Sequence, residues 1–215
     1  MGRARHRGGM REYAMASIKT AHLKLPASTE DLRALEIGTV VYLTGRIFTA
    51  REGVYKRAIE DGAGMPASKA ELGAVTATAS FRFAKWLEGW FRLSGCNIII
   101  GKGGMTSEVY RTHFVPNHAI YLTTVGYGTG ALLGRGIKRV ANVFWLQELG
   151  LAQAVWVLDV ENFGPFLVES DLAGASLFER ENAKIDAGLA KLYEGTRSPT
   201  MRRLGDADDK TQEVI

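Results

Sequence analysis

The sequence predicts an α/β domain with a largely parallel or mixed central sheet flanked by helices. Short runs rich in valine and isoleucine have the composition of buried strands. They lie at residues 40–44, 97–101, 119–124 and 155–160. Segments with helical periodicity separate most of these runs. This alternation favours parallel pairing, because a crossover helix returns the chain to the same end of the sheet.

Length and composition indicate one folded domain with a tail at each end. The chain has 215 residues, of which 46% are hydrophobic and 23% are charged, which is ordinary for a protein with a sizeable core. We expect a disordered basic tail at residues 1–20, one domain at 21–194 and a loose tail at 195–215. The formal charge of +4 is mild. The basic tail lacks an apolar stripe and contains Gly8–Gly9, so no targeting helix is expected, and no nucleic-acid partner is predicted.

Cysteine content and hydropathy indicate the compartment. No apolar run reaches the roughly 18 residues that a membrane-spanning helix needs. Cys96 is the sole cysteine, so it cannot form an internal disulfide or hold a metal cluster by itself. We therefore expect a cytoplasmic protein that does not contact a membrane.

The remaining elements are predicted in chain order. A helix should begin at Ser28 or Thr29, since either can cap it before an acidic first turn. The strand at 40–44 should end in a turn at Thr44–Gly45, and a helix should follow at 52–60. A loop is expected at Asp61–Pro66 by composition.

The second half should begin with a periodic helix at about 81–93. Its apolar stripe consists of Phe83, Trp86, Leu87, Trp90 and Phe91. Residues 130–147 are expected to be mixed helix, followed after the strand at 155–160 by a turn at Glu161–Pro165. A short strand at 166–168 and a helix at 177–193 should close the fold.

Arg51 is the first candidate binding residue, because it follows the first strand and opens the next helix. In open α/β sheets, ligands bind beyond the carboxyl ends of strands. A guanidinium in that place suits a carboxylate or phosphate, to which its planar fork donates two parallel hydrogen bonds.

Lys102 and Gly103 form the second candidate, in the segment Gly101–Gly104 after a strand. The segment is not a nucleoside-triphosphate loop, because the preceding glycine and the Ser/Thr after the lysine are missing. Its glycines still allow backbone N–H groups to face an anion, and Thr106 or Ser107 can cap a following helix. Two interpretations of this segment remain: an anion-binding site and a turn without a binding role.

Thr78 and Arg82 form the third candidate. If the helix begins near Ser80, Thr78 lies just before its N-terminus and Arg82 lies in its first turn. Unpaired N–H groups and partial positive charge at that end favour an anion. The alternative is a plain helix cap followed by a solvated arginine.

Two further patterns bear on catalysis. The segment Gly126–Gly130 is similar to a dinucleotide-binding loop, but Ala131 stands where the third glycine belongs. The hypothesis of a nucleotide-binding enzyme therefore rests on glycine loops alone. The histidines show no ligand or catalytic spacing, and no serine nucleophile pattern is present.

Taken together, four segments resemble the C-terminal domain of class I fumarases, which also exists as the separate β subunit of L(+)-tartrate dehydratase and of two-subunit fumarases. The similarity covers about residues 20–190. In the family's order, the segments are Leu43–Glu52 with Lys56–Arg57, then Thr78–Phe83, then Ile99–Met105, and last Glu148–Gly150 with Ala154–Pro165.

The resemblance implies a swivelling β/β/α domain that closes over a 4Fe–4S cluster, which the partner α subunit holds and this chain alone does not. It implies a hetero-oligomeric hydro-lyase that reversibly adds water to a C4 dicarboxylate, either fumarate/malate or L(+)-tartrate. By the same resemblance, Arg51 and Arg82 clamp substrate carboxylates. Lys102, with Gly103 beside it, adds charge and a donor, and Thr78 takes part in proton transfer.

The chain departs from the family at three places. Thr76–Ala79 replaces a Gly-Pro-Thr-Thr segment, Tyr55 replaces a histidine, and the chain runs from Pro66 to Thr78 without an extra stretch that the family has. A second hypothesis therefore stays open: a non-catalytic anion-binding or assembly module of the same fold that has lost hydratase activity.

Overall fold

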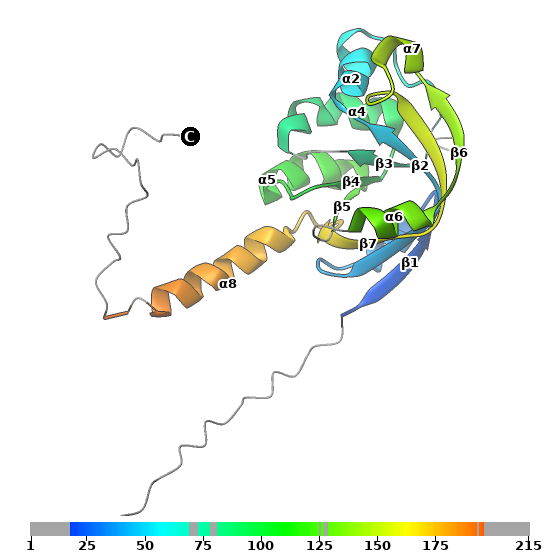
Figure 1. The fold of residues 1–215 in the computed structure, drawn as a ribbon. Coiled ribbons are helices and arrows are strands. Elements are labelled where there is room, and N and C mark those ends of the chain that lie inside the picture. Colours follow the sequence, from blue (N-terminus) through cyan, green and yellow to red (C-terminus); the bar gives the residue numbers. More distant parts are fainter. Residues whose placement is uncertain are drawn as a thin grey trace, which may run out of the picture. The chain divides into compact units, whose positions relative to one another are not determined.

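The computed structural model describes residues 18–68, 73–77, 81–124, 126, 129–192 and 194–195. They fall into two compact units, one that ends at Phe178 and one that begins at Glu179. The first unit carries the sheet (Figure 1). Most of the predicted tails, residues 1–17 and 196–215, lie outside the described residues. No helix in the described part of the chain is long and apolar enough to span a bilayer.

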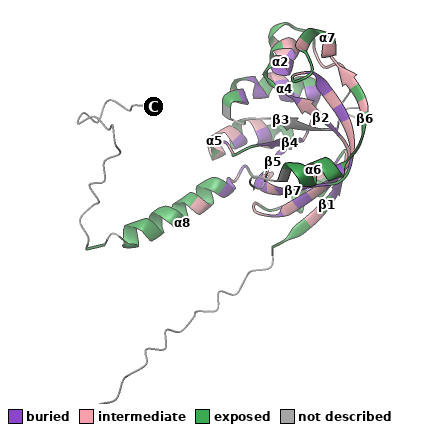
Figure 2. Ribbon diagram, viewed as in Figure 1, coloured by how far each residue is buried: buried purple, intermediate pink, exposed green. Residues whose placement is uncertain are grey.

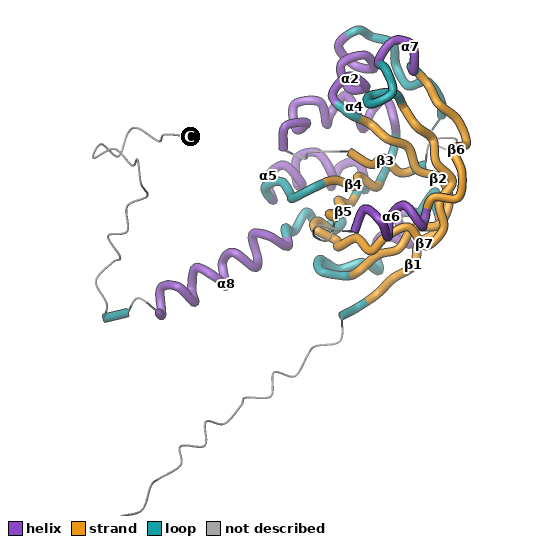
Figure 3. The backbone as a smooth tube through the Cα atoms, viewed as in Figure 1, coloured by secondary structure: helices purple, strands orange, loops and turns teal. Residues whose placement is uncertain are grey.

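Seven strands among the described residues form one mixed sheet, in the order β1-β2-β3-β4-β5-β7-β6. Neighbours from β1 to β5 pair in parallel. The last strand, β7, pairs antiparallel with β2, β5 and β6. The predicted fold class is confirmed, because helices flank this mixed sheet (Figure 3). The strands are β1 Thr20–Lys24, β2 Val40–Ala50, β3 Ala74–Ala77, β4 Ile98–Gly101, β5 Ile120–Thr124, β6 Ile137–Phe144 and β7 Val155–Ser170.

The pairing between β2 and β7 closes part of the sheet into a ring. It extends from Val40 opposite Leu167 to Phe48 opposite Val157. Since β2, β3, β4, β5 and β7 each pair with two others of this set, they form a continuous circuit. The two long strands run side by side and curve together (Figure 1). The strands β1 and β6 do not belong to this circuit. The strand β1 pairs with β2, and β6 pairs with β7.

Except for α8, the described helices are short, and several continue into tighter or wider turns. The cap at Ser28 is confirmed, since its hydroxyl accepts from the Asp31 amide at 3.2 Å and its amide donates to the Asp31 carboxylate at 2.8 Å. The helical segments are α1 Thr29–Arg33, α2 Glu52–Tyr55 with the π-turn Lys56–Glu60, the 3₁₀ segment Phe81–Trp86 with α4 Leu87–Ser94, α5 Ser107–Val109 with Tyr110–Asn117, α6 Thr129–Gly136, α7 Leu146–Leu149 and α8 Leu177–Leu192.

Two hydrophobic cores lie on opposite faces of the strands. Because side chains alternate along a strand, Ile99 and Tyr121 point to one core, while Ile98, Ile100 and Leu122 point to the other. The first core lies under α2 and α4, and it includes the whole predicted apolar stripe of the helix at 81–93. The second lies among the strands, with α1 packed on it. Buried residues follow the strands accordingly (Figure 2).

Three local predictions were wrong. The first strand does not end at Thr44–Gly45, because Gly45 adopts a φ of 137° and forms an irregularity within β2. Residues Glu161–Pro165 do not form a turn but belong to the continuous strand β7. Residues 137–144 form the strand β6 rather than a helix.

The second unit contains most of α8, which confirms the predicted closing helix. Its apolar residues Ile185, Leu189 and Leu192 are exposed. They share one side of the helix, because they are spaced by four and three positions.

Candidate functional site

Arg51 lies where the sequence predicts it, between the end of β2 and the start of α2. Ala50 is the last residue of the strand and Arg51 is the N-cap of the helix, with extended φ and ψ of −121° and 179°. Its Nη1 donates a hydrogen bond to the carbonyl oxygen of Ala152 at 3.3 Å. The side chain is therefore held against the segment before β7 while remaining exposed.

Lys102 and Gly103 also follow a strand directly, since β4 ends at Gly101. Both residues are exposed. Gly103 has a φ of 65°, a left-handed conformation that glycine adopts without strain. The expected cap is present, because the Thr106 hydroxyl accepts from the Val109 amide at 3.4 Å.

The structure brings the three predicted cations together around one pocket of about 500 Å³. Its lining consists of Arg51, Glu52, Arg82, Phe83, Lys102, Ala152 and Gln153. The cause is the sheet order, because β2, β3 and β4 are parallel neighbours whose carboxyl ends meet at one edge. Of the other two predicted site residues, Gly103 is not among the lining residues, and Thr78 follows the end of β3 in the sequence and lies outside the described residues.

Glu52 contributes a negative charge to this pocket. It forms an ion pair with Lys56 at 3.0 Å. The pKa of Glu52 is lowered first by the hydrogen bond from Lys56 and by its charge, and further by the charges of Arg82 and Lys85. The carboxyl is therefore ionised at neutral pH. With three cations and one carboxylate, the lining has a net charge of +2.

Gln153 and Ala152 are pocket residues that sequence reasoning did not find. The Gln153 Oε1 accepts from the Gly53 amide at 2.7 Å and so ties the start of α2 to the segment before β7. The two groups are 100 positions apart in the chain. No local sequence pattern reports such a contact.

Tyr55, which departs from the family pattern, does not line the pocket. It is 1% exposed, and its ring stacks on Phe83 with centroids 4.9 Å apart. Trp86 stacks on Tyr55 as well. Burial is the main cause that raises the pKa of Tyr55. The tyrosine therefore supports the aromatic wall of the pocket from behind.

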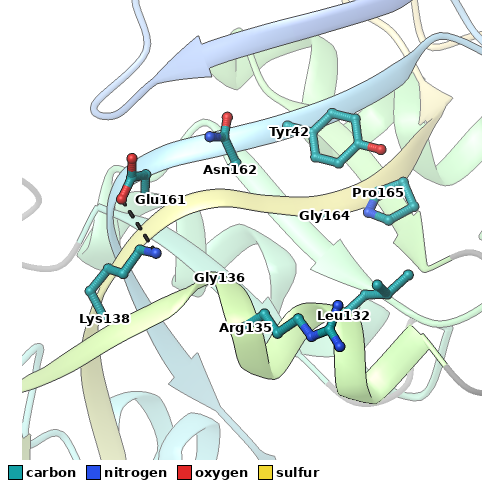
Figure 4. A pocket seen from close by; sticks show the side chains of 9 residues that line it. All are labelled: Tyr42, Leu132, Arg135, Gly136, Lys138, Glu161, Asn162, Gly164 and Pro165. Carbon is teal, nitrogen blue, oxygen red and sulfur yellow. Dashed lines mark ion pairs between the residues drawn. The ribbon is translucent and has the colours of Figure 1, made fainter.

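A second pocket of about 320 Å³ lies between α6, β2 and β7 (Figure 4). Its lining consists of Tyr42, Leu132, Arg135, Gly136, Lys138, Glu161, Asn162, Gly164 and Pro165. The figure shows Lys138 directed at Glu161, with which it forms an ion pair at 3.4 Å. None of the predicted site residues is among them. The pocket at Arg51 is therefore the better candidate for an anion.

The described residues do not fit an iron–sulfur cluster. Among them, no group of three or more His, Cys, Asp or Glu side chains could hold a metal ion. Cys96 is 2% exposed, and its sulfur accepts from the Ser94 hydroxyl at 3.3 Å. A cluster at this site would therefore need ligands from outside the described residues.

Comparison with known proteins defines the class of this domain. Residues 62–181 match the family model described as Fumarase C-terminus. The chain belongs to this family.

Individual relatives carry more particular names. The chain is 29% identical over 185 residues to L(+)-tartrate dehydratase subunit beta of Escherichia coli, which covers 77% of this chain and 89% of that protein. It is 34% identical over 188 residues to a Methanocaldococcus jannaschii protein that is provisionally named L(+)-tartrate dehydratase subunit beta. This match covers 76% of this chain and 93% of that protein. A provisionally named class I fumarate hydratase of Geobacillus stearothermophilus is 28% identical over 174 residues, 73% of this chain and 33% of that protein.

Proposed function

We propose that the chain is the β subunit of a hydro-lyase that reversibly adds or removes water on a small C4 dicarboxylate. The observation that carries this proposal is the shared pocket of Arg51, Arg82 and Lys102. The matched relatives named as beta subunits support it, because the chain covers 89% and 93% of their length. In this proposal a separate α subunit holds the 4Fe–4S cluster, which when bound supplies a Lewis acid for the substrate hydroxyl.

The pocket suits a substrate with two carboxylates. Its net charge of +2 balances the charge of −2 that a dicarboxylate brings, and its volume of about 500 Å³ leaves room for a four-carbon acid. Each arginine can donate two parallel hydrogen bonds to one carboxylate, whereas Lys102 acts as a point charge. Binding both ends of the substrate fixes its orientation for elimination.

The same cations also favour the transition state. Removing a proton next to a carboxylate increases the negative charge on that carboxylate. Fixed positive groups that already face it stabilise this charge without reorganising. Arg51, Arg82 and Lys102 therefore act in binding and in lowering the barrier.

Thr78 is proposed as the hydroxyl that takes part in proton transfer. Support comes from its spacing of four positions to Arg82, which aligns it with the family motif, and from its place in the sequence directly after β3. The strand β3 lies between β2 and β4, the strands that precede Arg51 and Lys102. A threonine hydroxyl is a weak acid and base, so this role needs a neighbouring group to assist it.

An α subunit is also expected to cover the site. Arg51 and Lys102 are exposed, and exposed charges interact weakly with a substrate in water. A partner that closes over the pocket would exclude water and strengthen these contacts. We propose a hetero-oligomer in the cytoplasm, a compartment in which the single buried Cys96 stays reduced.

The test is to co-express the chain with an α-type subunit and to purify the complex without oxygen. Turnover is measured on L(+)-tartrate, fumarate and malate. Arg51→Ala and Lys102→Ala should each lower kcat/KM by about 10-fold or more, since each removes a charged hydrogen-bond donor. Arg33→Ala is the control, because Arg33 is an exposed cation outside the pocket.

The outcomes separate the two hypotheses. Loss of activity in the pocket variants but not in the control supports the hydro-lyase. Full activity in both pocket variants contradicts it. A stable complex without turnover on any of the three acids supports the non-catalytic binding or assembly module.

A further inference from the structure

Glu169 is a buried carboxylate that the proposed chemistry does not use. It lies on β7 and is 0% exposed. The Ser176 hydroxyl donates to its Oε1 at 2.7 Å. A buried carboxylate is costly unless several donors compensate it, so its partners show what it holds in place.

Tyr110 is the second partner, and it connects Glu169 to the loop after β4. The Tyr110 oxygen accepts from the Met105 amide at 2.8 Å, and the hydroxyl is hydrogen-bonded to Glu169. Burial and then the charge of Glu169 raise the pKa of Tyr110. The phenol therefore stays protonated and donates a hydrogen bond to the carboxylate, while its oxygen accepts from the Met105 amide of the loop.

Gly104 brings the same carboxylate into direct contact with the loop. A Cβ added at Gly104 would lie 2.6 Å from Glu169 Oε1, which is closer than a van der Waals contact. Glu169 thus fixes the loop at two adjacent residues, at Gly104 by contact and at Met105 through Tyr110. Lys102 is only two positions before Gly104.

We propose that Glu169 is a positioning residue that holds the loop Gly103–Met105 and thereby directs Lys102 into the pocket. The role of Lys102 in this inference rests on the proposed function. The charge of Glu169 matters because an ionised carboxylate accepts from Ser176 and Tyr110 at once. A neutral amide accepts weaker hydrogen bonds than a carboxylate and brings two N–H donors into a buried site, so it cannot stand in for the carboxylate.

The first experiment is a double-mutant cycle in the two-subunit complex. Glu169→Gln should lower kcat/KM by about 10-fold, with the same split between KM and kcat as Lys102→Ala. Added to Lys102→Ala, it should lower kcat/KM by less than about 3-fold, because the side chain that it positions is already absent. Additive losses would overturn the inference. Ser170→Ala is the control, because Ser170 is buried next to Glu169 and its hydroxyl has no hydrogen-bond partner among the described residues. This variant should change kcat/KM little.

The second experiment needs no catalytic activity. Amide hydrogen exchange is measured at Met105 in wild type, Glu169→Gln, Tyr110→Phe and Ser170→Ala. Exchange should be about 10-fold faster in the first two variants and unchanged in Ser170→Ala, because only the former weaken the hydrogen bond at Met105. Tyr110→Phe serves if Glu169→Gln does not fold.

These results separate the inference from the proposed function. Unchanged exchange at Met105 in both Glu169→Gln and Tyr110→Phe overturns the positioning role even if the wild type is active. Faster exchange together with a wild type that has no turnover overturns the hydro-lyase and supports the control of the loop by Glu169.

Discussion

Gly104→Ala is expected to destabilise the protein because the loop has no room for a methyl group. The new Cβ would lie 2.6 Å from Oε1 and 2.7 Å from Cδ of Glu169, and 2.7 Å from Cδ2 of Phe178. The Phe178 ring is 41% exposed and can rotate away, whereas Glu169 is fully buried. The loop must therefore move instead of the carboxylate.

The magnitude follows from this overlap. Forcing an extra methyl group into a packed site costs about 1–3 kcal/mol. We expect about 2 kcal/mol here, since one of the two neighbours can yield. For a domain of this length, each kcal/mol lowers Tm by about 2–4 °C. The expected fall in Tm is therefore about 4–8 °C.

The assay is thermal unfolding followed by circular dichroism, with Gly103→Asn as the matched control. An added Cβ at Gly103 would meet nothing within 4 Å, and asparagine tolerates the left-handed backbone better than most residues. The control should lose less than about 1 kcal/mol. A Gly104→Ala protein as stable as the wild type would refute the reasoning.

Three further predictions concern other parts of the molecule. In Asp159→Asn, the loss of the hydrogen bond from Arg46 (2.8 Å) and of the ion pair with Arg139 (2.6 Å) should cost about 1 kcal/mol, a discounted value because these groups are partly exposed. Those arginines, chiefly Arg46 by its hydrogen bond, lower the pKa of Asp159 in the folded protein. The stability that they provide is therefore present above the ordinary pKa of 3.8 and is lost as the pH falls through the folded pKa. Urea midpoints measured at about pH 7 and pH 3 should differ less in the variant than in wild type. Ser28→Ala should lower the free energy of unfolding by about 1 kcal/mol through loss of the helix cap, measured by urea denaturation. Arg51→Lys should lower kcat/KM by about 10-fold and Arg51→Ala by about 100-fold, because lysine keeps the charge but not the planar fork; equal activity of all three proteins would contradict a carboxylate clamp.

The site was largely predictable where a charged residue directly follows a buried strand. Arg51 and Lys102 stand at such places, and the parallel order of β2, β3 and β4 brings them to one edge. By contrast, Gln153 and Ala152 reach the pocket from a distant segment of the chain. Their contribution depends on tertiary structure that no local pattern encodes.

The missed strands have physical reasons as well. The first four residues of β6 are exposed, so the strand lacks the alternation that identifies a half-buried strand. In β7, Asn162 and Pro165 predict a turn by their local preferences. Pairing with β2 overrides these preferences, because Phe163 lies opposite Leu43 and Phe166 lies opposite Val41.

The circuit of β2, β3, β4, β5 and β7 has a consequence for aggregation. In the described part of the chain it leaves only β1 and β6 with an outer edge, where another molecule could add a strand and start a fibril. Lys24 stands on β1, and Lys138 and Arg139 stand on β6. Lysine and arginine at an edge repel a second copy of the same strand. These charges therefore disfavour strand addition at the two edges where backbone hydrogen-bonding groups are unpaired.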